Sequence, residues 1–136
     1  MFLTGGLVAA TAPLIIGKPE KKPWRVGVIG HTGRGNYGHG LDTVWNLLDE
    51  TTIVAVADAN AGGLAKAKNK LKVDKGYADY RDMLEKERPE IVAVCPRHVD
   101  QRVPMITAGC EAGAKGIYCE KAMACSVAEC DEMIQV

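Results

Sequence analysis

Hydrophobic residues alternate, from Trp24 onward, between short continuous runs and stripes spaced every three or four positions. The continuous runs predict buried strands over residues 25–29, 52–57, 91–95 and 116–119, with a brief additional strand at Tyr77. The stripes predict helices with one buried face, formed by Leu41, Val44, Trp45 and Leu48, by Leu64, Ala67 and Leu71, by Tyr80, Met83 and Leu84, and by Val99, Val103, Ile106 and Cys110.

Strands that are apolar on both faces and alternate with helices predict a parallel sheet covered on both sides. We therefore expect an α/β protein with a three-layer αβα, Rossmann-type doubly wound parallel sheet. In such a sheet the ligand crevice lies at the carboxyl ends of the strands.

Capping and breaking residues predict where several helices begin and end. Asp79 can cap the helix that starts at Tyr80, and Pro89 prevents that helix from continuing. Gly109 and Gly113 are available to stop the next helix. Residues 126–129 read Ser-Val-Ala-Glu, a capping box that opens a last helix.

The beginning of the chain differs from the rest, because residues 2–16 are apolar or small and no charge precedes Lys18. This segment is too short for a stable membrane span and resembles the apolar core of a secretory leader, with a small-residue cleavage pattern at residues 10–12. We expect a truncated twin-arginine-type leader and hence export. The alternative is a disordered or loosely docked arm on a cytoplasmic protein. Residues 1–23 then form leader and linker, and residues 24–136 form the domain.

Composition narrows the classes of partner. A length of 136 residues fits one domain, and the 17 basic and 17 acidic residues balance. This balance argues against nucleic acid, whose binding proteins carry a clustered basic excess. The five cysteines are odd in number and lack a Cys-x-x-Cys pair, which argues against disulfides and zinc. His31 and His39 have no carboxylate or cysteine at a metal spacing, so we expect no bound metal.

A glycine-rich segment, residues 30–38, follows the first predicted strand directly. A phosphate-binding turn needs glycine where the backbone bends sharply or approaches a pyrophosphate, and N–H groups at the next helix start hold the anion. Gly30 and Gly35 match the outer glycines of G-x-G-x-x-G, whereas Thr32 takes the middle position and Gly33 follows it. The predicted cofactor contacts here are Gly30, His31, Thr32, Gly33, Arg34 and Gly35.

Asp58 ends the second predicted strand, 23 residues after Gly35. A carboxylate at this place can accept hydrogen bonds from a ribose and would repel a 2′-phosphate. Asp58 therefore favours NAD as the cofactor, although the nearby Arg34 could still accommodate NADP. A helix N-cap is a second role that is compatible with the first.

Five short segments follow one another in a specific order and spacing: residues 26–30 (Val-Gly-Val-Ile-Gly), 56–58 (Val-Ala-Asp), 77–80 (Tyr-Ala-Asp-Tyr), 94–96 (Val-Cys-Pro) and 118–121 (Tyr-Cys-Glu-Lys). Together they resemble the N-terminal domain of the Gfo/Idh/MocA family, which comprises glucose–fructose oxidoreductase, inositol dehydrogenase and their relatives. The resemblance covers roughly residues 24–136. It implies NAD(P) binding and hydride transfer between the nicotinamide and a sugar or polyol-like alcohol.

The resemblance also implies roles for residues that end the fourth and fifth strands. A Thr-Pro-Asn segment that lines the family's cofactor pocket is matched by Cys95, Pro96 and Arg97. A Glu-Lys-Pro segment, whose lysine lies beside the nicotinamide and the substrate hydroxyl, is matched by Glu120 and Lys121. Lys121 is thus the expected catalytic residue, because an ammonium group stabilises a developing alkoxide and can relay a proton.

The chain departs from the family pattern at Thr32, Cys95, Arg97 and Ala122. Asp100 stands where a histidine often follows the strand-four proline, although His98 is close by. The change at Ala122 matters most, because a proline there would restrict the backbone of the preceding lysine. These departures leave open a non-catalytic nucleotide-binding module in which Lys121 is idle.

A family enzyme also needs a C-terminal substrate domain, for which this length leaves no room. We therefore expect a fragment or truncated product with little or no turnover by itself, and full-length partners comprising a dinucleotide cofactor and a small carbohydrate-like substrate. An uncovered sheet edge predicts marginal stability or association into a homo-oligomer. A different Rossmann reductase is another alternative, because the Gly-x-Thr-Gly-x-Gly loop has parallels among dihydrodipicolinate-reductase-like enzymes.

Overall fold

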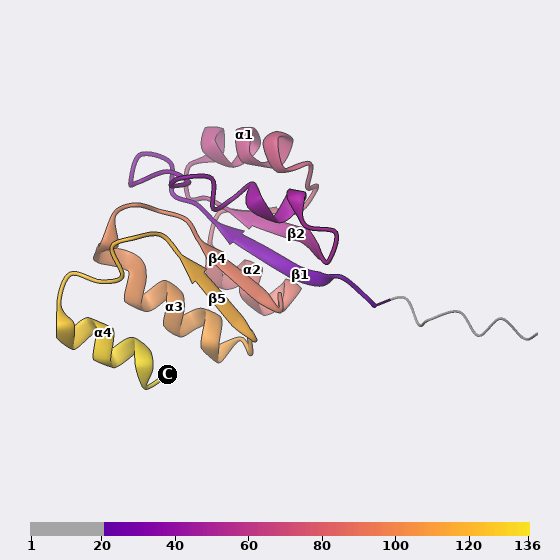
Figure 1. The fold of residues 1–136 in the computed structure, drawn as a ribbon. Coiled ribbons are helices and arrows are strands. Elements are labelled where there is room, and N and C mark those ends of the chain that lie inside the picture. Colours follow the sequence, from indigo (N-terminus) through magenta and orange to yellow (C-terminus); the bar gives the residue numbers. More distant parts are fainter. Residues whose placement is uncertain (1–20) are drawn as a thin grey trace, which may run out of the picture.

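Five parallel strands form one sheet within residues 21–136, which are the residues that the computed structural model describes. The strands are β1 (Trp24–Ile29), β2 (Thr51–Ala57), β3 (Gly76–Tyr77), β4 (Ile91–Val94) and β5 (Gly116–Cys119). Their order is β3-β2-β1-β4-β5, and Figure 1 shows β2, β1, β4 and β5 side by side. The strand order therefore reverses between β1 and β4, the switch point at which doubly wound sheets bind their ligands.

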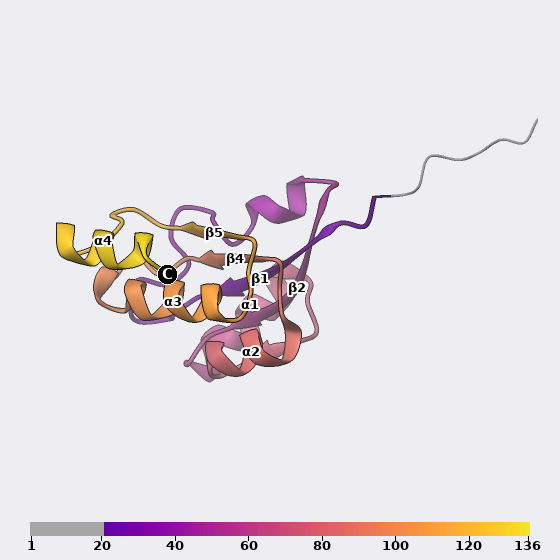
Figure 2. The ribbon, with the colours of Figure 1, turned by 90° about the horizontal axis from the view of Figure 1, so that it is seen from below.

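Helices cover both faces of this sheet, and the predicted three-layer αβα architecture is confirmed. One face carries α2 (Tyr80–Glu87) and α3 (Arg102–Glu111), with α4 (Val127–Ile134) packed against α3. The other face carries α1 (Ala61–Leu71) and a short 3-10 turn, η1 (Val44–Leu47). Figure 2 shows α2 and α3 on one side of the sheet and η1 on the opposite side. The sheet thus divides the hydrophobic core into two clusters, one beneath each helical layer.

The capping residues that the sequence predicts mark two helix starts. The Asp79 side chain accepts a hydrogen bond from the backbone N–H of Arg81 at 2.8 Å. Ser126 opens α4 in the same way, because its hydroxyl accepts from the backbone N–H of Glu129 at 3.2 Å. Such caps satisfy N–H groups that have no acceptor inside the first helical turn. The helix α2 ends before Pro89, as predicted.

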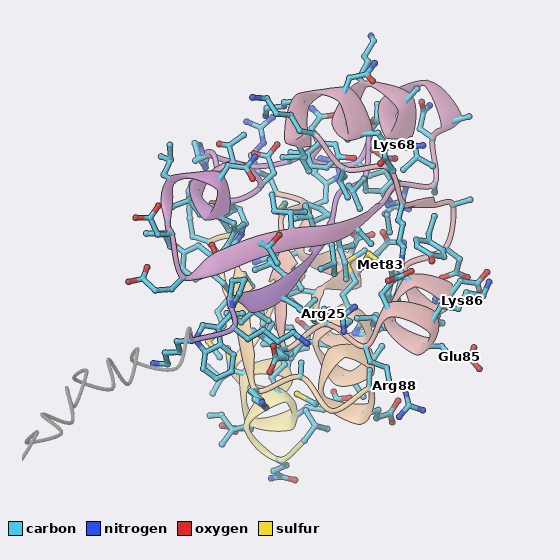
Figure 3. All side chains as sticks on the ribbon, turned by 90° about the vertical axis from the view of Figure 1, so that its right-hand side faces the viewer. Arg25, Lys68, Met83, Glu85, Lys86 and Arg88 are labelled. Atoms are coloured by element: carbon cyan, nitrogen blue, oxygen red, sulfur yellow. The ribbon has the colours of Figure 1, made fainter. Side chains whose placement is uncertain are left out.

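Helix α2 illustrates how the apolar stripe attaches a helix to the sheet. Figure 3 shows Met83 pointing toward the sheet, while Glu85 and Lys86 of the same helix point away from it. Met83 is fully buried and packs in the cluster beneath α2 and α3. The spacing of apolar residues therefore predicts correctly which face of this helix is buried.

The helix predicted from Leu41 to Leu48 is wrong in extent. Residues 31–43 form turns instead, and only Val44–Leu47 winds into a 3-10 helix. The backbone N–H groups of Thr43 and Asn46 donate three residues back, to Gly40 and Thr43 at 3.1 Å, and the backbone is already extended at Leu48, where φ is −114° and ψ is 117°. Of the four residues of this stripe, Trp45 is the buried one. An α-helix N-terminus that could hold an anion is therefore missing directly after the glycine-rich segment.

Helix α3 also differs from its predicted limits. Gly109, expected as a stop, lies inside the helix, where an added Cβ would sit 3.0 Å from Ile117 of β5. The chain leaves the helix at Gly113, whose φ is 84°. The buried stripe consists of Arg102, Met105, Ile106 and Gly109. The burial of Arg102 in this stripe is unusual, because arginine side chains are rarely buried.

The leader and cleavage pattern predicted within residues 1–16 lie outside the described residues, as does most of the predicted linker. Within residues 21–136, no helix is long and apolar enough to cross a membrane.

Candidate functional site

Three loops meet at the carboxyl ends of the strands (Figure 1). The loop after β1 contacts the loop after β4, because the Gly35 carbonyl accepts a hydrogen bond from the backbone N–H of Arg97 at 3.2 Å. The same β1 loop contacts the end of β5, where the backbone N–H of His39 donates to the Glu120 carboxylate at 2.9 Å. The fold therefore gathers the three groups of predicted site residues at one edge of the sheet.

A pocket of about 180 Å³ opens at this edge. Its wall comes from the ends of β1 and β2, the β3–α2 connection and the start of α3: Gly30, His31, Ala57, Asp58, Ala59, Ala78, Asp79, Tyr80, Arg81, Gln101 and Met105. The lining combines small apolar groups with a few polar ones. Such walls suit a flat heteroaromatic ligand that needs apolar faces and hydrogen-bonding partners at its rim.

Asp58 lies at the pocket but is 1% exposed, and protein groups occupy its carboxylate. Thr32 donates twice, from its backbone N–H at 3.1 Å and from its hydroxyl at 2.6 Å. The Tyr37 hydroxyl donates at 2.8 Å and the backbone N–H of Asn60 at 2.9 Å. A carboxylate has about four acceptor positions. A direct hydrogen bond from a ribose to Asp58 would therefore have to displace one of these donors.

Two glycines make this cluster around Asp58 sterically feasible. A Cβ on Gly30 would lie 2.1 Å from the ring of Tyr37, so the aromatic side chain occupies the space that the first glycine of the loop leaves free. A Cβ on Gly63 would lie 2.0 Å from the Thr32 hydroxyl. Burial, followed by the hydrogen bond to Asp58, raises the pKa of Tyr37 well above its usual value. The phenol therefore stays protonated and donates to Asp58.

The remaining β1-loop residues bond mostly to one another. The backbone N–H groups of Arg34 and Asn36 both donate to the His31 carbonyl at 2.9 Å. The N–H of Gly33 donates to the Asn36 side chain at 3.1 Å, and His31 Nδ1 lies 2.8 Å from the Gln101 side-chain oxygen. The loop is thus held together by its own hydrogen bonds, while Gly33 and Arg34 are exposed to solvent.

Arg34 forms a salt bridge with Asp100 at the surface. Both side chains are about half exposed, so the pair contributes little to stability. Asp100 is the residue that takes the place of the family's histidine. Its negative charge partly neutralises Arg34, the residue that could accept a 2′-phosphate.

The end of β4 presents its backbone more than its side chains. Cys95 is fully buried in the cluster beneath α1, and burial raises the pKa of its thiol well above the usual range. Pro96 is buried as well. Arg97 is exposed, and its Nε donates to the Gly35 carbonyl at 3.3 Å. Of these three predicted site residues, only Arg97 therefore offers an accessible side chain.

The end of β5 combines a buried acid with an exposed base. Glu120 is 3% exposed, and its carboxylate accepts from the backbone of His39, from its own neighbour Lys121 at 3.0 Å, and lies 3.0 Å from His39 Nδ1. Burial disfavours the charged form, but these hydrogen bonds outweigh it and hold the pKa of Glu120 below its usual value. Lys121 itself is exposed at the edge of the sheet.

Three residues of this edge were not predicted from the sequence: Tyr37, His39 and Arg102. Arg102 is 1% exposed, and its guanidinium donates to the carbonyls of Pro96, Glu120 and Ala122. Its position at i, relative to Met105 at i+3 and Ile106 at i+4, could have revealed an inward direction. No comparable sequence signal marks Tyr37 or His39. Within residues 21–136, no three His, Cys, Asp or Glu side chains cluster as a metal site would require.

Comparison with known proteins places this geometry in a family. The sequence model of the Gfo/Idh/MocA family, an oxidoreductase family with an NAD-binding Rossmann fold, matches residues 24–136. The myo-inositol 2-dehydrogenase of Thermotoga maritima is 30% identical over 111 residues, which cover 82% of this chain and 32% of that protein. The crystal structure of the myo-inositol 2-dehydrogenase from Lactobacillus plantarum has a TM-score of 0.68 at 30% identity, over 84% of this chain and 32% of that one.

An oxidoreductase from Agrobacterium radiobacter, solved in complex with NAD⁺, L-tartaric acid and magnesium, shares the fold with a TM-score of 0.72 at 15% identity, over 84% of this chain and 32% of that one. The chain thus spans about a third of the length of the relatives that it matches.

Fold and sequence match together define residues 24–136 as an NAD-binding Rossmann domain of an oxidoreductase. The chain belongs to the Gfo/Idh/MocA family, which confirms the resemblance and disfavours the dihydrodipicolinate-reductase-like alternative.

Proposed function

We propose that this chain binds NAD at the carboxyl edge of its sheet and that, in the whole protein, Lys121 takes part in hydride transfer to or from a polyol-like alcohol. The observation that carries this proposal is the exposed Lys121, which directly follows the buried Glu120 at the same edge as the pocket. When bound, the cofactor supplies the hydride chemistry. The chain's own residues bind it, orient it and place an ammonium group beside the reacting alcohol.

The residues at this edge fit the parts of a dinucleotide. The pocket between Ala59, Ala78 and Met105 has apolar walls for an adenine ring, with the Gln101 amide at its rim. The exposed Gly33, Arg34 and Arg97 would hold the phosphates, because arginine donates in a fork that matches phosphate oxygens. Of the other predicted contacts, His31 would line the pocket, whereas Gly30, Thr32, Gly35, Cys95 and Pro96 would act through backbone and packing.

The preference for NAD over NADP rests on Asp58 and Asp100. The Asp58 carboxylate is occupied by donors from Thr32, Tyr37 and Asn60, so we infer that it acts by charge rather than as a direct ribose acceptor. A 2′-phosphate near this buried carboxylate would be repelled. Arg34, which in this proposal contacts the diphosphate, is also paired with Asp100, so it is not free to attract a 2′-phosphate.

A polyol-like substrate is supported by the relatives, two of which are named as myo-inositol 2-dehydrogenases at 30% identity. A lysine suits this chemistry, because its charge stabilises an alkoxide as the hydroxyl proton leaves. A non-catalytic binding module is the second candidate. The observation that favours it is Ala122, which takes the place of the family's proline and leaves the backbone of Lys121 without that restraint.

Calorimetric titration with NAD⁺ and NADP⁺ tests the binding proposal. The variant Ala78→Trp fills the pocket from an exposed position, and Ala65→Trp on the outer face of α1 is the matched control. We expect saturable NAD⁺ binding by the parent chain and the control, weaker binding of NADP⁺, and about tenfold or greater loss of NAD⁺ affinity in Ala78→Trp, because a wall that excludes the ring forfeits its contacts. Equal NAD⁺ affinity in both variants would place the site elsewhere.

The catalytic part of the proposal is tested in a chimaera that joins this chain to the remaining two-thirds of a myo-inositol 2-dehydrogenase. We expect formation of NADH that depends on myo-inositol and is lost in Lys121→Ala, while NAD⁺ affinity changes by only a few fold. A chimaera that binds NAD⁺ and forms NADH equally well with and without Lys121 contradicts the role of this lysine.

A further inference from the structure

Arg102 is the buried cation of this edge, and its contacts converge on the two loops that border the site. Its terminal nitrogens donate to the Pro96 carbonyl at the end of β4 at 2.6 Å and to the carbonyls of Glu120 and Ala122 at the end of β5. The side chain is 1% exposed. One guanidinium therefore ties together two loops that are far apart in the sequence.

The two β5-loop acceptors lie on either side of Lys121. The carbonyl of Glu120 precedes the lysine and that of Ala122 follows it, so the guanidinium holds the chain on both flanks of this one residue. The Lys121 N–H is held within the same loop arrangement, because it donates to the Glu120 carboxylate at 3.0 Å. The backbone of Lys121 is thus constrained at its own amide and at both neighbouring carbonyls, while its side chain is exposed.

General stability does not explain an arginine in this position. Arg102 is the first residue of α3, where the helix dipole disfavours a positive charge. Within residues 21–136 no carboxylate forms a salt bridge with it, and its Nε has no hydrogen-bond partner. Burial of such a charge is costly unless its hydrogen bonds compensate for it. The three carbonyls are the compensation that the structure provides, and they point to the loops as the reason for the residue.

We propose that Arg102 is a positioning residue for Lys121: its guanidinium fixes the β5 loop by holding the carbonyls of Glu120 and Ala122. This inference rests on the proposed function only for what Lys121 does once it is placed. In this chain Ala122 stands where the family resemblance leads one to expect proline, which would restrict the lysine from its C-terminal side. Arg102 supplies a restraint from the carbonyl side instead.

Amide hydrogen exchange at Lys121 tests this inference in the free chain. The variant Arg102→Lys keeps the charge but lacks the planar fork that spans several carbonyls. We expect the Lys121 amide to exchange about tenfold faster in Arg102→Lys, because a charge-assisted hydrogen-bond network around it is lost, while amides of β1 and β2 keep their protection.

A proline at position 122 should restore slow exchange of the Lys121 amide in Arg102→Lys. If Arg102 only stabilised the fold in general, this proline would not restore it. We expect Ala122→Pro alone to change Lys121 exchange little and, in the Arg102→Lys background, to return the rate to within about threefold of the parent value, because proline restricts the preceding residue and lowers the entropy of the open loop. Unchanged exchange in Arg102→Lys, faster exchange across the entire sheet, or no rescue by Ala122→Pro would each overturn the proposal.

NAD⁺ titration of the same variants separates this proposal from the proposed function. Saturable NAD⁺ binding by the parent chain, with an affinity that changes by no more than a few fold in Arg102→Lys, supports both when the exchange results hold as well. If the exchange results hold but the chain binds no NAD⁺, the positioning of Lys121 stands and the assignment of the cofactor site fails.

Discussion

Two strands of this sheet end in a buried acid, and the residues that follow them differ. Asp58 after β2 and Glu120 after β5 are 1% and 3% exposed, and both carboxylates accept hydrogen bonds from the β1 loop. After Asp58 the chain turns directly into the cap of α1 at Asn60. After Glu120 it presents Lys121 at the surface of the edge.

An acid at the end of a strand is therefore not by itself a ligand-binding group. At β2 the acid holds the β1 loop through the hydroxyl groups of Thr32 and Tyr37, and the pocket beside it is lined by small apolar groups and a few polar ones. At β5 the acid orders the backbone of the next residue, which is the one free to meet a ligand. Both acids therefore support the backbone around them, and only the β5 acid is followed by an exposed lysine.

Removal of the β2 acid should have the largest effect. Asp58→Ala leaves the donors of Thr32, Tyr37 and Asn60 without their acceptor in a buried place, and we expect a loss of about 3 kcal/mol or more in the free energy of unfolding. Urea denaturation measures it, with the exposed Asp49→Ala as the control expected to change stability by less than about 0.5 kcal/mol. Equal stability of the two variants would mean that Asp58 does not support the loop.

Alanine substitutions at two adjacent glycines of α1 should change the stability by smaller amounts and in opposite directions. A Cβ on Gly63 would meet the Thr32 hydroxyl at 2.0 Å, so Gly63→Ala should destabilise by about 2 kcal/mol. A Cβ on Gly62 would lie 3.4 Å from its nearest neighbour, the Asn60 side chain, and alanine favours the helix, so Gly62→Ala should stabilise by about 0.5 kcal/mol. Thermal unfolding of both variants decides the point, and stabilisation by both would contradict the close approach of Thr32 to α1.

Tyr37→Phe should have a still smaller effect, because it removes one donor to Asp58 and keeps the ring beside Gly30. We expect a loss of about 1 kcal/mol in the free energy of unfolding. In Asp58→Ala the same substitution should cost almost nothing, since its acceptor is already gone. A double-mutant cycle measures this coupling, and additive losses would show that the Tyr37 hydroxyl does not depend on Asp58.

Substitution of Glu120, the β5 acid, should change the free energy of unfolding least, and the size of this change depends on pH. Hydrogen bonds from His39 and Lys121 keep the pKa of Glu120 below its unfolded value of about 4.3. Its contribution to stability is therefore present above that pH and is lost as the pH falls through the folded pKa. The stability difference between the parent chain and Glu120→Gln should thus shrink as the pH is lowered from 6 to 3, about the window of that titration. A difference that stays constant would mean that Glu120 is not held ionised by these bonds.

The sequence predicts the sheet well, because strand runs, caps and the buried face of α2 depend on local patterns that the residues carry themselves. It fails after β1, where Leu41, Val44 and Trp45 have helical spacing but the chain winds only into a 3-10 turn and is extended again at Leu48. It could not be predicted either that donors of the protein itself fill the hydrogen-bonding positions of the Asp58 carboxylate. It depends on Tyr37 and Thr32 folding back onto a strand more than twenty residues away, which spacing does not encode.

The candidate site shows the same division. The positions of Glu120 and Lys121 follow from the end of a strand and could be expected from the sequence. The direction of Arg102 could not be read with the same ease, because a charged residue in a helix normally faces water and only the three carbonyls of two other loops reverse that preference.

An NMR titration of the isotopically labelled chain with NAD⁺ tests most directly whether the supporting and ligand-facing ends of this edge are assigned correctly. We predict saturable shifts of the amides of Ala59, Ala78, Arg97 and Lys121, together with an Asn60 amide that keeps its hydrogen bond to Asp58. Shifts confined to the outer faces of α1 and α4, or the absence of any shift in a folded chain, would contradict a dinucleotide site at the carboxyl edge of the sheet.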